Sequence, residues 1–145
     1  MLLKKIYESS NYLTDEEATT AQVVNSANGA IAEINTKVGT KLPFYESNNY
    51  QEETYDKFGD SWQLRLIEPY LSFSIAANDT DIDARDFHYN RFLAALKEFQ
   101  ISGIDSIKTD DVDSEGNPID YKGTASRIVK INASSRINPF AGWWV

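Results

Sequence analysis

SWQLRLIEPYLSFSIAA, residues 61–77, is unusually apolar and predicts a helix at the centre of the fold. Its larger side chains fall along one helical stripe, which consists of Trp62, Leu66, Tyr70, Phe73 and Ala77. Asp60 or Ser61 can cap the start of this helix. Pro69 lies inside the pattern and removes a backbone hydrogen bond, so we expect either a kink or two short helices that divide near Glu68.

Two further helices are expected, one on each side of this stretch. The earlier helix begins at Thr14, because Thr14 and Glu17 can form a capping box, and it ends at Gly39. Its apolar face recurs at steps of three and four residues and consists of Val23, Ala27, Ala30, Ile31, Ile34 and Val38. The later helix ends before Gly103 and carries, at helical spacing, Phe87, Phe92, Leu93, Leu96 and Phe99. We expect the three helices to supply the core.

Residues 40–60 join the first helix to the central one and are rich in aromatic side chains. The segment also contains Pro43 and many polar residues, which indicates a loop pinned by its aromatic residues or a short irregular helix. We expect Phe58 and Trp62 to cover the helical core, because such residues bury a large apolar area. Core packing and a binding surface are both open interpretations for the tyrosines of this segment, which are Tyr45, Tyr50 and Tyr55.

After Gly103 the sequence changes to short β-branched stretches, separated by the turn-forming residues DSEGNP at 113–118. A β-hairpin is the simplest structure for this pattern. The predicted fold class is therefore mainly α (α+β), a small bundle of about three main helices with a C-terminal β-hairpin and an extended C-terminal arm. Residues 1–102 are expected to form the helical domain, residues 103–133 a hairpin that embellishes it, and residues 134–145 the arm.

The composition argues against several functional classes. The chain of 145 residues has a net charge of −8 and a pI near 4.6, so tight binding to nucleic-acid phosphates is not expected. It has no cysteine and one histidine, which leaves no disulfide, thiolate nucleophile or multi-histidine metal site. No segment approaches the ~20 apolar residues of a membrane span, and the start lacks a signal-peptide pattern. We therefore expect a protein that does not bind membranes and is assembled in the cytoplasm.

Neither catalysis nor a cofactor is expected. DVDSEGNPIDYK, residues 111–122, imitates the start of a calcium loop, but Lys122 stands where the final bidentate glutamate is required, so no metal site is predicted. His88 has Asp86 two residues away, which points elsewhere on a helix. No candidate serine in a strained turn and no glycine-rich phosphate loop accompanies His88. The predicted protein is not an enzyme, with no catalytic residue, metal or cofactor.

The C-terminal stretch SSRINPFAGWWV, residues 134–145, combines a proline, a glycine and three large aromatic residues without helical or strand periodicity. Two interpretations are open. The tail folds back on its own domain, or it docks on a partner and is ordered there through its aromatic side chains. The second interpretation predicts a partner-binding arm formed by Arg136, Pro139, Phe140, Trp143 and Trp144.

The order of elements resembles that of the head-tail connector proteins of tailed bacteriophages, which are also called adaptor or head-completion proteins. The resemblance covers most of the chain and rests on three stretches followed by a hairpin and a C-terminal arm. These stretches are TDEEATTAQVVNSANGAIAEINTKVGTKLPF (14–44), WQLRLIEPYLSFSIAAND (62–79) and RDFHYNRFLAALKEF (85–99).

The resemblance implies a structural virion protein of the neck, which forms a homo-oligomeric ring, expected to be a dodecamer, beneath the portal. Its partners would be the portal protein, neighbouring copies of the chain, and stopper or tail proteins. DNA would pass through the ring without tight binding, because an acidic lumen repels phosphates. The arm would reach the portal, and the hairpin tip would contact a neighbouring subunit or the next ring through Asp113, Glu115, Gly116 and Asn117.

Three alternatives remain open. A stopper or tail-completion protein would use the same arm to join a different ring. A small non-viral helical binding protein would capture a partner with its aromatic tail, and it would be a monomer or a dimer instead of a large ring. An enzyme would require an unmatched site built from carboxylates and His88.

Overall fold

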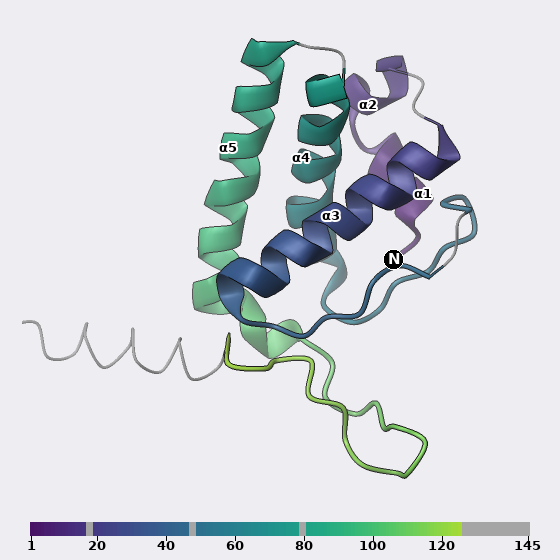
Figure 1. Cartoon of the computed structure of the whole chain (residues 1–145), viewed down its shortest axis with the longest axis vertical. Helices are drawn as coiled ribbons and strands as arrows, with labels where there is room; N and C mark the ends of the chain where they lie inside the picture. Colours follow the sequence, from purple (N-terminus) through teal and green to yellow (C-terminus); the bar gives the residue numbers. More distant parts are fainter. Residues whose placement is uncertain (17–18, 47–48, 79–80, 126–145) are drawn as a thin grey trace, which may run out of the picture.

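The computed structural model describes residues 1–16, 19–46, 49–78 and 81–125. Within these residues the chain is mainly helical, as predicted, and its five α-helices are α1 (Leu3–Glu8), α2 (Asn11–Glu16), α3 (Thr20–Val38), α4 (Asp60–Asn78) and α5 (Ile82–Glu98). Helices α4 and α5 run side by side, and α3 crosses them diagonally (Figure 1). Helix α4 contacts each of the other four, so the apolar stretch at 61–77 is the centre of the fold.

Helix α4 is a single helix that continues through Pro69, so the alternative of two short helices is not found. The expected apolar stripe is only partly correct: Leu66 is buried, but Ala77 is exposed and the aromatic members of the stripe are half-buried. The reason is that α4 has neighbours on several sides. Its fully buried side chains therefore do not form one stripe, and they are Gln63, Leu66, Ile67, Leu71, Ser72 and Ala76.

Helix α3 begins later than the sequence predicts. The capping box is formed by Thr19 and Gln22, in which the Thr19 hydroxyl accepts from the Gln22 N–H at 3.2 Å and the Gln22 side chain accepts from the Thr19 N–H at 2.8 Å. The prediction of a start at Thr14 is wrong, because Thr14 belongs to the separate helix α2. The end before Gly39 is confirmed, and all six residues of the predicted apolar face are buried.

Helices α1 and α2 were not predicted from the sequence. Each has six residues, and such short helices owe their stability to tertiary packing and not to their own hydrogen bonds. Leu3, Ile6 and Leu13 are completely buried. The start of α1 also joins the segment before α4, because the Leu3 N–H donates to the Glu53 carbonyl at 3.0 Å. The N-terminal residues therefore form part of the core.

Helix α5 begins at the cap Asp81, whose side chain accepts from the Ala84 N–H at 3.1 Å. Phe92, Leu96 and Phe99 are buried, as expected. Phe87 and Leu93 are not, with 61% and 36% of their area exposed. At about 100° per residue, Phe87 lies about 140° around the helix from Phe92, so the two side chains do not share one face. The prediction that Phe87 and Leu93 belong to the core is wrong.

The segment between α3 and α4 packs most of its aromatic residues against the core, whereas Phe44 is 51% exposed. Tyr45 and Tyr55 are buried and stacked, with ring centres 4.4 Å apart, and Tyr50 is half-buried. The prediction that Phe58 covers the core is confirmed, and Trp62 is half-buried against the same aromatic partner, Phe99. This packing holds the loop between α3 and α4 in place.

After α5 the helix continues as one π-helical turn, η1 (Phe99–Gly103), and then as a short 3-10 helix, η2 (Ile104–Ser106). Residues 107–122, called here the projecting loop, then stand off from the lower end of the helices in Figure 1. The predicted hairpin is present as one antiparallel bridge between Val112 and Pro118, and residues 103–125 contain no β-strand. The rest of the predicted second strand and the arm lie outside the described residues.

None of the helices in the described part of the chain is long and apolar enough to cross a membrane.

Candidate functional site

The residues predicted to contact partners fall into two groups. The arm residues Arg136, Pro139, Phe140, Trp143 and Trp144 lie outside the described residues. The predicted tip residues are all described, and they come together in one tight turn at the end of the projecting loop.

The turn is organised around Asp113. One carboxylate oxygen of Asp113 accepts from the N–H groups of Glu115 and Asn117 at 2.9 and 3.0 Å. The Asp113 N–H donates to the Asn117 carbonyl at 2.8 Å, and the Gly116 N–H donates to the Asp113 carbonyl at 3.1 Å. Gly116 has φ of 84°, in the left-handed region that glycine adopts without steric cost. The carboxylate thus holds the turn in shape, as aspartate commonly does.

The base of the projecting loop is fixed by Asp111. One oxygen of its carboxylate accepts from the Lys57 ammonium at 2.8 Å and from the Tyr121 hydroxyl at 2.9 Å. The other oxygen lies 3.3 Å from the Lys108 ammonium. The hydrogen bonds from Lys57 and Tyr121 hold the pKa of Asp111 at about 2, and the bond to Asp111 raises the pKa of Lys57. The carboxylate is therefore ionised at neutral pH and ties the loop to the segment before α4.

The C-terminal end of the projecting loop is attached to the end of α3. The Lys41 N–H donates to the Tyr121 carbonyl at 2.8 Å, and the Thr124 N–H donates to the Gly39 carbonyl at 2.9 Å. Gly123 has φ of 57° and lies so close to Gly39 that a Cβ atom would overlap the Gly39 carbonyl oxygen. A glycine is therefore required for this approach.

The tip presents negative charge to the solvent. Its exposed acidic residues are Asp110, Asp113, Glu115 and Asp120, and Val112 beside them is 57% exposed. The first carboxylates of the apparent calcium loop, Asp111 and Asp113, are occupied by donors from the protein itself. In the described part of the chain, no group of three or more His, Asp or Glu side chains is placed to hold a metal ion. The projecting loop is thus an acidic projection that is fixed at its base by hydrogen bonds.

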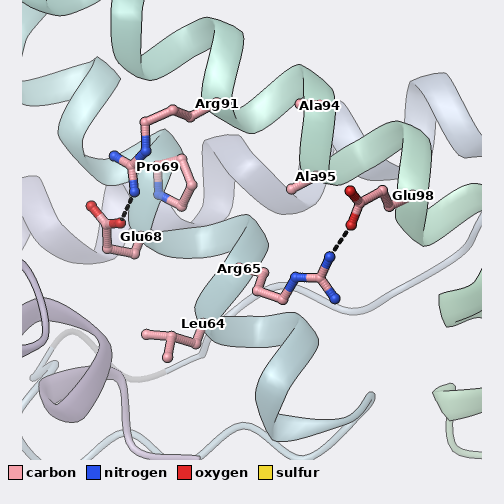
Figure 2. Close-up of a pocket in the computed structure, with 8 residues that line it drawn as sticks. All are labelled: Leu64, Arg65, Glu68, Pro69, Arg91, Ala94, Ala95 and Glu98. Carbon is pink, nitrogen blue, oxygen red and sulfur yellow. Dashed lines mark hydrogen bonds and ion pairs between the residues drawn. The ribbon is translucent and has the colours of Figure 1, made fainter.

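A second candidate surface lies where α4 and α5 face the solvent together. We call it the α4–α5 face. Two ion pairs, Arg65 with Glu98 and Arg91 with Glu68, bridge the helices, and small or apolar residues lie between them (Figure 2). The Arg65 guanidinium also lies 4.0 Å from the centre of the Trp62 ring. The face contains a hollow of about 460 Å³ lined by Leu64, Arg65, Glu68, Pro69, Arg91, Ala94, Ala95 and Glu98.

One of these ion pairs extends into a buried polar cluster. The Glu68 carboxylate accepts from the Ser72 hydroxyl at 2.6 Å as well as from Arg91. Burial opposes the ionisation of Glu68, but the hydrogen bonds from Arg91 and Ser72 outweigh it and lower the pKa of the carboxyl. Arg91 also donates to Nδ1 of His88 at 2.8 Å, and the Tyr12 ring packs 4.8 Å from the imidazole.

His88 is therefore a structural residue of the α2–α5 contact. It is buried, and burial together with the charge of Arg91 lowers the pKa of the imidazole. The sequence places Arg91 three residues after His88, a spacing that indicates neighbours on one helix face. Glu68, which pairs with Arg91, and Tyr12, which packs on His88, come from distant segments, and no local pattern predicts them.

Comparisons of this chain with family models, with curated proteins and with solved structures found no match.

Proposed function

We propose that this protein is a head-tail connector of a tailed bacteriophage. It would assemble into a ring under the portal and link the DNA-filled head to the tail. The proposal rests first on the resemblance in the order of elements, in which a helical domain precedes a hairpin and an aromatic arm. The mainly helical fold agrees with that order, and the bridge between Val112 and Pro118 lies where the hairpin is expected.

The observation that carries the proposal is that the projecting loop and the end of the described residues lie at the same end of the domain. The projecting loop and the yellow-green end of the described trace both lie at the lower end of the helices in Figure 1. The loop is held at its base by Asp111 and at its other end by Gly39. A protein that joins two rings needs two separate binding surfaces, and the proposal assigns one to the projecting loop and the other to the arm.

The charge of the molecule supports the same function. The net charge is −8, and part of this charge is the four exposed carboxylates at the tip of the projecting loop, with no basic residue between Asp110 and Asp120. Carboxylates do not retain DNA phosphates, so DNA can pass a ring of such subunits. The arm, with Phe140, Trp143 and Trp144, would anchor the subunit on the portal, because buried tryptophans dominate many interfaces.

The test is to mix the protein with the portal ring encoded by the same genome and to image the product. Three forms are compared: the full chain, a chain truncated after Asn138, and a full-length variant with Trp143→Ala and Trp144→Ala. We expect the full chain to add a ring to the portal, and both altered forms to lose it. Failure of the full chain to join, or equal joining by the truncated chain, would contradict the proposal. Tight binding to duplex DNA at moderate salt would also contradict it.

A further inference from the structure

The single histidine of the chain, His88, accepts a hydrogen bond that it can form only while it is neutral. The Arg91 guanidinium lies 2.8 Å from Nδ1 of the imidazole. A guanidinium has donors and no acceptor, so Nδ1 must carry a lone pair and the proton of the neutral ring must be on Nε2. A protonated imidazole has two donors and no acceptor. This contact therefore cannot survive protonation of His88.

The other groups that face His88 tolerate a positive charge on the ring. They come from α5, α4, α2 and the cap of α5, and they are Arg91, Glu68, Tyr12 and Asp81. Burial and the charge of Arg91 lower the pKa of the imidazole, whereas Glu68 and Asp81 raise it. The Tyr12 ring, whose centre is 4.8 Å away, can also accept a cation near its face. Arg91 is thus the neighbour whose contact must change when the ring takes up a proton.

We propose that His88, Arg91 and Glu68 form a pH-sensitive switch in which Glu68 exchanges one cation for another. At neutral pH the guanidinium bridges the other two side chains, because one of its amino groups bonds to His88 and the other to Glu68. In acid the protonated imidazole takes the place of the guanidinium and donates from Nδ1 to the Glu68 carboxylate. Arg91 then leaves the cluster for the solvent.

Arg91 can be solvated in a way that Glu68 cannot. The Arg91 side chain is 37% exposed and borders the hollow of the α4–α5 face, whereas the Glu68 side chain is only 12% exposed (Figure 2). A carboxylate at that depth is costly without a cationic partner. The Arg91 guanidinium already lies 5.9 Å from the centre of the exposed Phe87 ring, so an outward position can keep this cation–π contact. The α4–α5 face therefore gains an unpaired cation in acid.

The switch lies within the helical domain. His88 and Arg91 belong to α5 and Glu68 belongs to α4, so no part of the switch lies in the projecting loop or in the arm. It is thus independent of the proposed function, and its failure would leave the portal experiment unaffected.

NMR of the full chain, titrated from about pH 7.5 to about pH 5, tests the switch. Because the chain has one histidine, the ring nitrogens of His88 give an unambiguous signal. We expect the tautomer with its proton on Nε2 at neutral pH. As His88 takes up its second proton, the order parameter of the Arg91 Nε–H should fall below about 0.6, the range of flexible groups. Arg65, whose partner is Glu98, is the matched control in the same sample, and its order parameter should stay unchanged.

Three variants test the roles of the three side chains. A glutamine at position 88 can accept from Arg91 but does not titrate, so His88→Gln should keep Arg91 ordered throughout the titration. Arg91→Gln should move the midpoint of the His88 titration to higher pH, and Glu68→Gln should move it to lower pH, because they remove opposite charges. Circular dichroism checks that each variant remains helical.

Several results would overturn the inference. They are a neutral His88 with its proton on Nδ1, a His88 that stays neutral until the chain unfolds, an Arg91 that stays ordered when His88 is protonated, and the same loss of order in His88→Gln. An equal loss of order at Arg65 would also overturn it, because the acid would then loosen the helices in general. So would midpoint shifts of the same sign in Arg91→Gln and Glu68→Gln.

Discussion

Replacing Gly123 with alanine should detach the C-terminal end of the projecting loop, whereas the same change at Gly116 should not. Both glycines have positive φ, 57° and 84°. They differ in their surroundings. A Cβ atom at Gly123 would overlap the carbonyl oxygen of Gly39, whereas a Cβ atom at Gly116 would meet nothing within 4 Å. Gly116→Ala is therefore a matched control that carries the conformational cost alone.

The magnitudes follow from these contacts. The left-handed conformation costs alanine about 1–2 kcal/mol, of which about 0.4–1 kcal/mol is offset because alanine also restricts the unfolded chain. Gly116→Ala should thus cost about 1 kcal/mol. At Gly123 the loop must also withdraw from Gly39, which breaks the bonds from Thr124 to Gly39 and from Lys41 to Tyr121. At about 1 kcal/mol each, these losses bring the cost of Gly123→Ala to about 3 kcal/mol.

Urea unfolding followed by circular dichroism measures the change in the free energy of unfolding. If the end of the loop detaches while the helices stay folded, part of the destabilisation will not appear in the free energy of unfolding. Amide hydrogen exchange then reports it, because the N–H groups of Thr124 and Lys41 lose protection in Gly123→Ala and keep it in Gly116→Ala. Equal costs for the two variants, with unchanged exchange at Thr124, would refute the role assigned to the close approach of Gly123 and Gly39.

Three further perturbations test the contacts around the site. Because the pKa of His88 is lowered in the folded state, the unfolded chain takes up the proton first as the pH falls. The free energy of unfolding measured in urea should therefore decrease below about pH 6.5, and His88→Gln should remove that decrease. The pKa of Asp111 is held at about 2, so its carboxylate is charged at neutral pH and holds the loop. At neutral pH the Ile119 N–H should therefore be better protected from exchange in the unmodified protein than in Asp111→Asn. This difference in protection should disappear only as the pH falls from about 4 to below 2. Asn35 exchanges two 2.9 Å hydrogen bonds with the backbone of Leu42, so Asn35→Ala should lower the urea unfolding free energy by about 2 kcal/mol; an unchanged midpoint would show that water replaces the side chain.

The sequence correctly predicts those helices whose buried residues all recur at the helical period along one face. Helix α3 packs through one face, so spacings of three and four identify all six of its predicted core residues. Helix α4 packs on several sides, and a single stripe does not describe it. Phe87 looks like a core residue by its type, yet it lies on the solvent side, because α5 is buried along a different line. Periodicity gives the helix but not the direction of its neighbours.

The site divides in a similar way. The tip of the projecting loop was predictable, because a turn is formed by residues that are close in the sequence. Its base was not, because Lys57 and Asp111 are 54 residues apart and nothing local links them. The shift of the capping box from Thr14 to Thr19 has the same origin: both threonines have a suitable residue three positions later, and the packing of α2 decides between them.

The π-helical turn η1 is a place where the chain holds one residue more than its path requires. A π-turn holds one residue more than the α-turn that it replaces, and both complete one full turn. Deleting one residue between Phe99 and Gly103 would therefore restore α-helical spacing and leave the direction of the projecting loop relative to α5 nearly unchanged. The same deletion within α5 would rotate everything that follows by about 100°. The chain can thus lose a residue at η1 without re-aiming its acidic tip.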